Sequence, residues 1–514
     1  MNRKHSTTMK PVLSAIERSA IILLALLAAP VLARAADGND VGVPRLGLDP
    51  GEPQSPSPPP AVPFGVQPAQ SKEYVLDFHG YLLLPATLGL HERPDPQPGQ
   101  SSLVLHSPPL VPQDLRDFEY TGVVPSPWLQ LNFIYGNSTV SATVIVAGTS
   151  AIDAAGYYDP VAQMGVNDAY LTVNLTKWLS IPLQVNVGAL TGRYGAMGGY
   201  DAGRYGTPLI ARTNTIGETI TGSVRLGADF FLMFEQGLGG QMGRPPIGLV
   251  PAGWNDFANA NVGATFVNHA HLGLAYSQLL RLGFHYLTAW TQDDLADGGG
   301  GQVPDGRITV LGADVNFTAG RAGHLYFGAA HTWATNASTV SGAIEILNAR
   351  GGPELVAHYL GPNSNGNGSL SIFGGQYDLS LARLVFGKWY TGLSPDVTIS
   401  LFGVGASVSS QDPAYDGVLK LKGGVEATYS LLSWMGVSER FDHVRLNNSD
   451  SKQAFTSLAT RLLFHTGWRS RNEIALQYAY FVYGSSVQAL TGYPPVLEVN
   501  PDRQVFSLTG TIWW

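Results

Sequence analysis

The last residues of the chain alternate between apolar and polar positions with a period of two. Phe506, Leu508 and Ile512 fall on one side of an extended segment, whereas Thr509 and Thr511 fall on the other. Such alternation over about ten residues is what a strand between lipid and a watery lumen requires. A soluble sheet can also contain one strand of this kind, so the weight of the pattern depends on whether it recurs.

The alternation recurs along the chain from about residue 73 onward. Clear examples are residues 128–135, 168–175, 183–189, 219–226, 419–431 and 473–482. Helical spacing fits none of these windows, and charge stays off one of the two faces. The pattern predicts an all-β fold, namely a transmembrane antiparallel β-barrel of 16–18 strands with long extracellular loops. Because no strand edge can stay unpaired in lipid, Glu73–Leu84 is expected to pair with Arg503–Trp514.

The connections between these segments differ in length. Long ones are predicted near residues 85–125, 191–214, 238–257, 292–306, 335–369 and 484–502, and several are rich in Gly, Pro, Asn and Asp. The spacing of apolar residues from Val340 to Leu360 predicts a short helix inside one of them. A barrel of this size has a lumen too wide for side chains alone to fill, so it is either a channel or is plugged by loops that fold inward.

Two segments precede the predicted barrel. Arg3, Lys4 and Lys10 form a basic start, and Ala20–Ala33 is mostly apolar. Ala33 and Ala35 then supply the two small residues that a signal peptidase reads, so residues 1–35 are predicted to be a signal peptide. Residues 36–72 are rich in proline and have too few large apolar side chains for a core, which predicts a disordered periplasmic linker. The barrel then spans residues 73–514, and the outer membrane of a Gram-negative bacterium is the expected location.

Composition narrows the function classes. Charged residues make up 13 %, about half the usual share of roughly 25 %, and 61 of 514 residues are glycine. The chain has no cysteine, which excludes disulfides and thiolate metal sites, and its net charge of −8 argues against binding nucleic acid. His269 and His271 share a strand face without a carboxylate at metal-binding spacing. There is no Gly-x-Ser-x-Gly motif, so we expect no enzyme, cofactor or metal.

The two ends of the barrel carry a more specific signal. The first strand contains Asp77-Phe78-His79-Gly80-Tyr81 and the last ends Ile512-Trp513-Trp514. Both ends resemble the maltoporin-type sugar porins, in which residues at the positions of Tyr81 and Trp513 belong to a track of aromatic rings that guides sugars. The resemblance covers only the strands that close the barrel. Leu83 stands where that family has a basic residue, and the loop cysteines of the family are missing.

Periodicity places Asp77, His79 and Tyr81 on one polar face, and Trp513 on the same face as Thr511. Pyranose rings pack on aromatic rings while their hydroxyls need hydrogen-bond partners, so such a wall suits sugars. Trp513 could instead be an aromatic residue of the membrane interface. Trp128 and Tyr170 share a lumen-facing phase, and ordinary packing against a loop remains open for both. The predicted substrate path consists of Tyr81, Trp513, His79, Asp77, Trp128, Tyr170, Arg225 and Arg461.

Charged residues also fall on lumen-facing phases, with both signs represented: Arg225, Arg461, Lys420, Lys422, Asp168, Asp229, Glu426 and Glu473. Such rings of charge set ion preference, although they could simply be a solvated wall. Phe506 and Trp514, on the lipid-facing phase, are predicted to be an assembly signal read by the outer-membrane barrel assembly machinery.

The function expected from these features is an outer-membrane channel for passive passage of small hydrophilic solutes, with oligosaccharides as the first choice. A polysaccharide export conduit and a non-specific general porin are the alternatives. The expected partners are outer-membrane lipid, the assembly machinery and the solutes themselves, and a homotrimer is left open.

Overall fold

The computed structural model describes residues 73–89, 128–149, 163–176, 178–179, 182–200, 205–227, 229–242, 264–277, 279–292, 305–337, 340, 344–345, 356–364, 366–387, 395–445, 447–466, 471–484, 489–491, 496–498 and 504–513. The chain divides into two units, Met1–Pro44 and Arg45–Trp514, and every described residue belongs to the second. The predicted signal peptide and linker, residues 1–72, lie outside the described residues.

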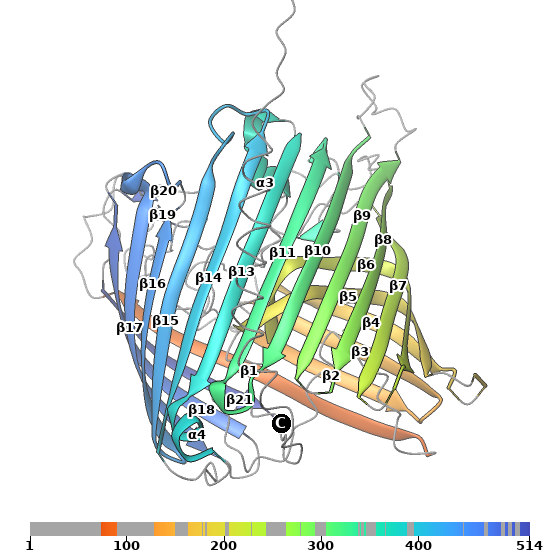
Figure 1. Cartoon of the computed structure of the whole chain (residues 1–514), viewed down its shortest axis with the longest axis horizontal. Coiled ribbons are helices and arrows are strands. Elements are labelled where there is room, and N and C mark those ends of the chain that lie inside the picture. The colour runs from red at the N-terminus through yellow and green to blue at the C-terminus, as the bar shows by residue number, and fades with distance from the viewer. Residues whose placement is uncertain are drawn as a thin grey trace, which may run out of the picture. The chain divides into compact units, whose positions relative to one another are not determined.

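Eighteen strands form one closed antiparallel β-barrel in which each strand is hydrogen-bonded on both sides (Figure 1). The wall strands are β1 (Val75–Gly89), β2 (Trp128–Gly136), β3 (Val140–Thr149), β4 (Gln163–Asn174), β5 (Leu183–Tyr200), β6 (Tyr205–Arg225), β7 (Phe230–Met242), β8 (Ala264–Tyr276), β9 (Leu280–Gln292), β10 (Arg307–Thr318), β11 (His324–Thr335), β13 (Gly368–Ser380), β14 (Asp396–Ser410), β15 (Leu419–Leu432), β16 (Met435–Arg445), β17 (Ala454–Thr466), β18 (Arg471–Tyr483) and β21 (Gln504–Trp513). β12 (Ile344–Glu345) pairs with β6 instead of taking a place in the wall, since β11 pairs directly with β13. β19 (Ala489–Thr491) and β20 (Val496–Glu498) form a separate two-stranded sheet.

The first and last wall strands close the barrel. β1 pairs with β21 in a register that sets Tyr81 opposite Trp513 and Leu88 opposite Phe506. On its other side β1 pairs with β2, with Leu83 opposite Trp128. The sheet therefore has no free edge at this point, as a barrel in lipid requires. The predicted fold class is confirmed. The two ends pair as predicted, but over residues 81–89 and 505–513, so only Tyr81–Leu84 of the expected segment Glu73–Leu84 takes part.

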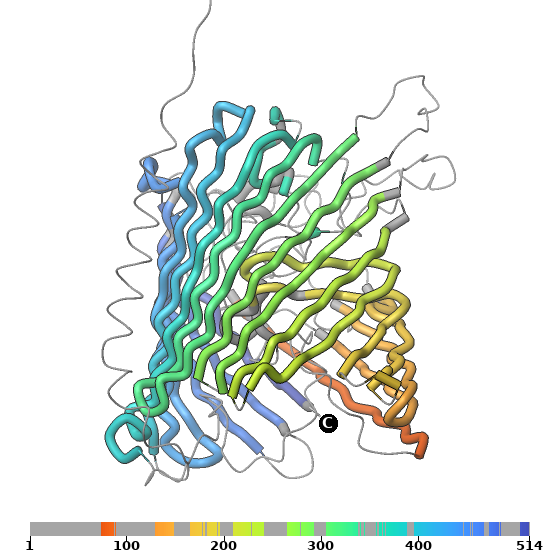
Figure 2. Tube along the Cα trace, turned by 45° about the vertical axis from the view of Figure 1, so that its right-hand side comes forward, coloured from red at the N-terminus to blue at the C-terminus, as the bar shows by residue number. Residues whose placement is uncertain are grey.

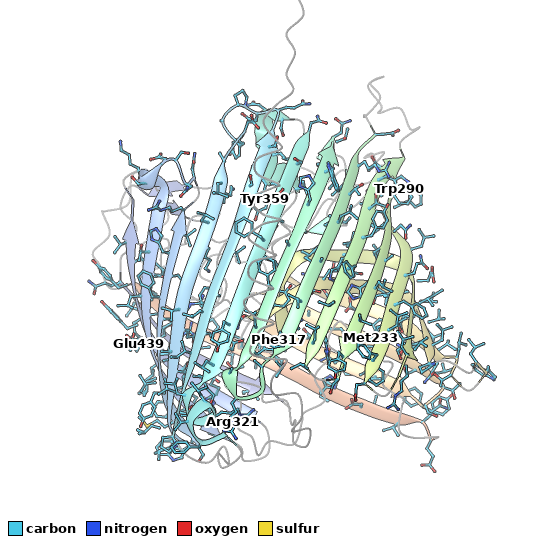
Figure 3. The ribbon with its side chains drawn as sticks, in the orientation of Figure 1. Met233, Trp290, Phe317, Arg321, Tyr359 and Glu439 are labelled. Atoms are coloured by element: carbon cyan, nitrogen blue, oxygen red, sulfur yellow. The ribbon has the colours of Figure 1, made fainter. Side chains whose placement is uncertain are left out.

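The outer face of the barrel is apolar. Exposed large side chains cover it, among them Phe133, Leu171, Leu272, Phe284, Leu311, Phe327, Phe373, Leu401, Leu458 and Leu508. Aromatic rings mark both ends of this band: Figure 3 shows Trp290 near one end of the barrel and Phe317 toward the other. Apolar side chains between two aromatic girdles suit a bilayer, so the chain is an outer-membrane barrel, as predicted.

Connections differ in length between the two ends of the barrel. At one end β8 and β9 are joined by residues 277–279, and β15 and β16 by residues 433–434. At the other end, residues 90–127 join β1 to β2 and residues 243–263 join β7 to β8. Outer-membrane barrels have short periplasmic turns and longer extracellular loops. The short-turn end, where β1 begins and β21 ends, is thus the periplasmic one.

Two sequence expectations about connections are wrong in detail. Residues 191–214 are not a loop, because they lie mostly within β5 and β6, which pair from Leu183 opposite Gly222 to Tyr200 opposite Tyr205. The glycines of this stretch, which suggested a loop, are tolerated because the strands bulge beside Gly195, whose φ is 67°. The helix expected from Val340 to Leu360 is confined, among the described residues, to α3 (Val356–Leu360).

The remaining helical elements are short. They are α4 (Leu381–Phe386), η3 (Gly320–Ala322), η5 (Pro362–Ser364) and η7 (Ser451–Gln453). α4 lies at the short-turn end and is capped by Ser380, whose hydroxyl accepts a hydrogen bond from the backbone N–H of Arg383. Within the part of the chain that the structure describes, no helix is long and apolar enough to cross a membrane.

Candidate functional site: the barrel lumen

The end of β5 and the beginning of β6 leave the wall and enter the lumen. β5 pairs with β4 only as far as Ala189, and β6 begins to pair with β7 only at Ile216. Between these points β5 and β6 remain paired with each other, and we call the two paired arms, residues 190–200 and 205–215, the lumen hairpin. In Figure 2 its yellow trace turns away from the wall and runs across toward the opposite strands.

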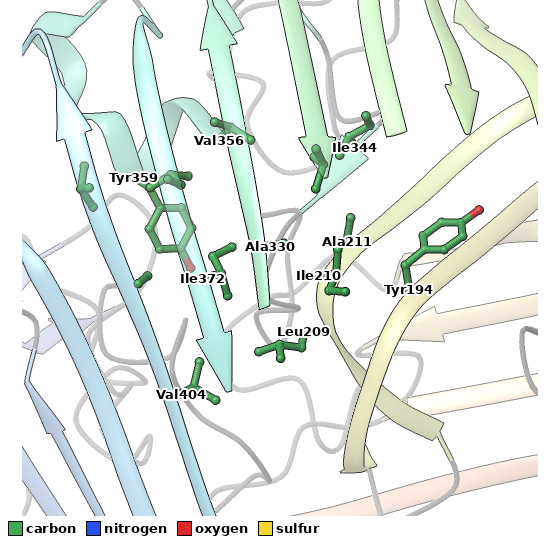
Figure 4. Packing of buried hydrophobic residues seen from close by; sticks show 14 of the residues in the cluster. Tyr194, Leu209, Ile210, Ala211, Ala330, Ile344, Val356, Tyr359, Ile372 and Val404 are labelled. Atoms are coloured by element: carbon green, nitrogen blue, oxygen red, sulfur yellow. The ribbon is translucent and has the colours of Figure 1, made fainter. Parts of the chain in front are cut away.

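Apolar side chains of the lumen hairpin pack against the far wall. Leu209 and Ile210 are buried, at 1 % and 0 % exposure, in a cluster with inward-facing residues of β8 to β14 (Figure 4). The wall receives them at glycines. A Cβ atom would lie 2.9 Å from Ile210 at Gly312 and 2.8 Å from Leu209 at Gly374. The far wall is therefore shaped to the hairpin, which lies across the lumen.

A second segment, between β11 and β13, also packs inside. Ile344 and Glu345 of β12 pair with Thr213 and Arg212 of the lumen hairpin. The described buried residues of this segment are Ala337, Val340, Ile344, Val356, Tyr359, Leu360 and Ser364. The ammonium of Lys420 on β15 lies 4.7 Å from the centroid of the Tyr359 ring, a cation–π contact between this segment and the wall. The sequence predicted either an open channel or a lumen plugged by loops that fold inward. In the structure, two inserted segments narrow the lumen.

Histidines gather where the lumen hairpin meets β7 and β8. The Tyr194 hydroxyl, on the hairpin, donates to Glu235 Oε1 at 3.1 Å and lies 2.7 Å from His269 Nδ1. Next to it, His271 Nδ1 lies 2.6 Å from His285 Nδ1, and His285 Nε2 lies 3.3 Å from a carboxylate oxygen of Asp314. The Tyr194 hydroxyl and Glu235 lie against His269, and Asp314 lies against His285, so these buried imidazoles have polar neighbours.

This cluster differs from what the sequence suggested. His269 and His271 share a face, as expected, but Glu235 and Asp314 supply nearby carboxylates from neighbouring strands. Among the described side chains, no group of three or more His, Asp or Glu residues is arranged to hold a metal ion. The geometry instead joins the hairpin to the wall through the hydroxyl of Tyr194.

The opposite side of the lumen carries a charged network on β15, β16 and β17. The Arg440 guanidinium donates from Nε and Nη2 to the two oxygens of Asp442, at 2.6 and 2.9 Å, and from Nη1 to Glu426 at 3.3 Å. Lys422 Nζ lies 3.3 Å from Asp442, and Arg461 reaches the other Glu426 oxygen at 3.4 Å. Both partners of the Arg440–Asp442 pair are almost fully buried, at 0 % and 2 %. The fork of two hydrogen bonds fixes the geometry of this pair.

Positive charge exceeds negative charge in this network. Lys420 and Lys422 of β15 join Arg440 and Arg461, against the carboxylates Glu426 and Asp442. The Phe402 ring adds a π face, with its centroid 4.8 Å from the Arg440 guanidinium carbon and 5.8 Å from Lys422 Nζ. An inner wall with charges of both signs and a basic excess can attract anions and still hold itself together.

The predicted path residues at the ends of the chain come together at the closing seam. Asp77, His79 and Tyr81 lie on β1, and Asp77 Oδ2 is 3.3 Å from His79 Nδ1. Tyr81 is opposite Trp513 on one side of β1 and Gln130 on the other. His79 and Tyr81 are buried, at 3 % and 0 %. The side chains of Trp128 and Trp513 lie outside the described part of the structure, although their backbones flank β1.

The other predicted path residues are spread around the barrel. Tyr170 is on β4, three strands from Asp77 through Ile134 and Thr143, which is about 14 Å at the usual strand spacing. Arg461, on β17, donates to Gln477 at 2.6 Å and belongs to the charged network. Arg225 is exposed at the short-turn end of β6 and donates to the backbone oxygen of Gly227 at 2.9 Å. The structure thus joins Arg461 to a network and leaves Arg225 at the rim.

Of the two residues predicted as an assembly signal, the structure describes Phe506, which lies near the start of β21. Phe506 is 40 % exposed and shares the outer face with Leu508 and Ile512. Trp514 lies outside the described residues.

Sequence reasoning missed the residues that organise the lumen. Tyr194 stands in a glycine-rich stretch that suggested a loop, so its strand phase was not considered. On β16, Arg440 and Asp442 fall on one phase of the strand and Val437 and Phe441 on the other, which is an alternation that the sequence shows. Glu439 obscures this alternation, because it is a charged residue on the outer phase. Asp314 was hidden for a different reason, since its partner His285 is on another strand.

Comparisons with known proteins assign no family to the chain. No protein-family model matches the chain, and no curated protein matches it. Among solved structures, the outer-membrane channel DcaP of Acinetobacter baumannii is 10 % identical over 86 % of this chain and 97 % of its own, with a TM-score of 0.38. Wzi of Escherichia coli, a carbohydrate-binding β-barrel involved in capsule assembly, is 11 % identical over 85 % of this chain and 84 % of its own, with a TM-score of 0.41. OmpT of Vibrio cholerae, an outer-membrane protein, is 10 % identical over 87 % of this chain and all of its own, with a TM-score of 0.36. Similarity this low assigns no function.

Proposed function

We propose that the protein is an outer-membrane channel for the passive passage of small hydrophilic solutes. The observation that carries this proposal is the contrast between the two faces of the barrel. The outer face is apolar, whereas the inner face carries Arg440, Asp442 and Glu426 in one wall and His269 with Glu235 in another. Hydrogen-bonding and charged groups that line the lumen can interact with a hydrated solute, whereas the lipid core cannot.

Oligosaccharides are the solutes we propose first. Tyr81 and Trp513 are opposite each other at the seam, next to His79, Gln130 and Asn132, which can serve hydroxyl groups. The Gln130 amide donates to Asn132 at 3.0 Å, so both side chains are held in place. Tyr81 is fully buried in this state, and a sugar can reach its ring only when the groups that cover it move. The proposal thus includes a rearrangement at the seam.

A bilayer recording of the purified full-length chain tests both the channel and its proposed preference for oligosaccharides. The barrel is expected to conduct ions, and oligosaccharides such as maltohexaose are expected to interrupt the current transiently. Binding must stay weak enough for release, in roughly the millimolar to micromolar range, or about 4–8 kcal/mol. Trp513→Ala should shorten the interruptions without abolishing conduction, because it removes a stacking surface only.

The matched control is Trp333→Ala, which removes an indole from the outer face, where Trp333 is 46 % exposed. This change should leave the interruptions unaltered. If oligosaccharides never perturb the current although ions pass, the sugar assignment fails and a general porin remains. If long polysaccharide chains block the current for much longer than short ones, the export conduit is favoured. A barrel that folds but conducts no ions refutes the channel itself.

A further inference from the structure

We propose that the lumen hairpin, residues 190–200 and 205–215, is a gate that swings about a pair of opposed glycines, Gly188 and Gly217. This inference rests on the proposed channel function and concerns how that channel opens. The described state, in which Leu209 and Ile210 are seated on the far wall, is the closed one.

The root of the hairpin has the geometry of a hinge. Gly188 on β5 is directly opposite Gly217 on β6. The last pair between β4 and β5 is at Ala189, and the first pair between β6 and β7 is at Ile216. Both strands therefore lose their outer neighbours one residue beyond the two glycines. Gly188 has φ of 143°, a conformation that a residue with a side chain rarely adopts.

Close packing also requires glycine at both positions. A Cβ atom at Gly188 would lie 2.2 Å from the backbone oxygen of Ala169, and one at Gly217 would lie 2.2 Å from that of Leu238. Gly510 in β21 differs, since a Cβ there would meet nothing within 4 Å. The pair thus combines backbone freedom with a position where the outer ladders end, and this combination is what a hinge needs.

Beyond this root, side chains hold the hairpin. Its contacts with the wall include apolar packing at Gly312, Gly328 and Gly374 and the hydrogen bonds of Tyr194 to Glu235 and His269. Near the root, the Thr191 hydroxyl also donates to Asp168 at 2.6 Å and accepts from Asn167 at 3.4 Å. Its backbone pairing outside itself is the two-residue bridge to β12. A wall strand, in contrast, has continuous ladders on both sides, as β8 has thirteen residue pairs with β7. Releasing the hairpin therefore breaks few hydrogen bonds, whereas releasing a wall strand breaks many.

We call the contact of Leu209 and Ile210 with the wall the seat. Its composition favours separation of the whole hairpin from the wall in one step. The wall presents glycines, which have no side chains to interlock, and the hairpin presents Leu209 and Ile210 as two knobs. Packed surfaces of this kind have two discrete arrangements, seated and unseated, rather than a continuum. When the hairpin is unseated, the space between β6 and the wall strands β10, β11 and β13 becomes available to solutes.

A disulfide across the seat tests the gate. The chain has no cysteine, so Leu209→Cys with Gly374→Cys introduces a single possible bridge. A Cβ at position 374 would lie 2.8 Å from a terminal carbon of Leu209, so the two positions are in direct contact across the seat, as a disulfide requires. The oxidised double variant is expected to lose its transitions to the high-conductance level, and reduction should restore them. The single variants Leu209→Cys and Gly374→Cys, treated with the same oxidant, are the controls.

The outcomes separate the gate from the channel. If the bridged and reduced forms show the same conductance levels and the same opening frequency, the gate is refuted and the channel stands. If neither form conducts, and a variant with residues 191–213 replaced by a short turn does not conduct either, both proposals fail. Loss of transitions in the bridged form alone supports the gate.

Two further measurements do not depend on the double variant. In the wild-type protein in lipid, amides of residues 191–213 should exchange hydrogen together and at least tenfold faster than those of residues 219–224, and equal protection would contradict the gate. Gly217→Ala should reduce the opening frequency in barrels that still shift on heating in gel electrophoresis. Gly510→Ala, where a Cβ has open space, should not. Unchanged gating in a folded Gly217→Ala barrel would speak against the hinge.

Discussion

Replacing Arg440 with alanine should be among the most destabilising single changes in the barrel wall. The arginine side chain is fully buried and donates two short hydrogen bonds to Asp442 and a longer one to Glu426. Alanine removes all three and leaves two carboxylates facing each other inside a lumen wall. Desolvated charges without partners are costly, so the effect arises mainly from what is left behind.

The structure sets the size of the effect. Removing one partner of a buried ion pair costs about 3–5 kcal/mol. Lys422 stays 3.3 Å from Asp442, and Arg461 stays 3.4 Å from Glu426, so each carboxylate keeps one cation. We therefore expect the lower end, about 3 kcal/mol, which is roughly a hundredfold in the unfolding equilibrium. Arg440→Lys keeps the charge but loses the fork and should cost about half as much.

Urea-induced unfolding from lipid vesicles, followed by tryptophan fluorescence and by heat-modifiability on gels, measures this difference. Arg225→Ala is the matched control, because Arg225 is exposed at the rim and its described contacts are a hydrogen bond to Gly227 and a ring contact with Phe231. It should cost less than about 1 kcal/mol. Equal losses for Arg440→Ala and Arg225→Ala would refute the reasoning, since burial would then make no difference.

Two other predictions concern the hairpin and the last residue. Tyr194→Phe keeps the ring but removes the hydroxyl that bonds Glu235 and His269, so it should cost about 1–2 kcal/mol and raise hydrogen exchange in residues 190–215, measured by mass spectrometry; unchanged exchange there would show that the hydroxyl does not hold the hairpin. Deleting Trp514 should reduce the amount of heat-modifiable barrel in outer membranes while conductance per assembled channel stays the same, and normal assembly without this residue would count against its role as a signal.

The wall of the barrel could be predicted because one rule determines it. Every wall strand separates lipid from lumen, so alternation alone identifies strands such as Ala454–Thr466, and the absence of a free edge identifies β1 and β21 as partners. The glycine-rich part of β5 and β6 lies inside the barrel, where both faces meet protein. Alternation is lost there, and Tyr194 through Ala211 consequently looked like a loop.

The interior network was harder to predict for another reason. Arg440 and Asp442 are on the same strand and two residues apart, and their pairing could be read from the sequence. The contacts of His285 with His271 and Asp314 depend instead on the register between β8, β9 and β10. A shift of one residue in any of these strands would turn these side chains to the outside. A single sequence fixes the phase of each strand, but it does not fix this register.

The position of the seam determines when the barrel wall can close. Tyr81 and Trp513, which are paired across it, belong to the first and the last wall strand in chain order. Without β21, the edges of β1 and β18 would be unpaired, because β21 pairs with both. A wall that lacks its last strand is therefore an open sheet that is prone to aggregation and not a smaller pore.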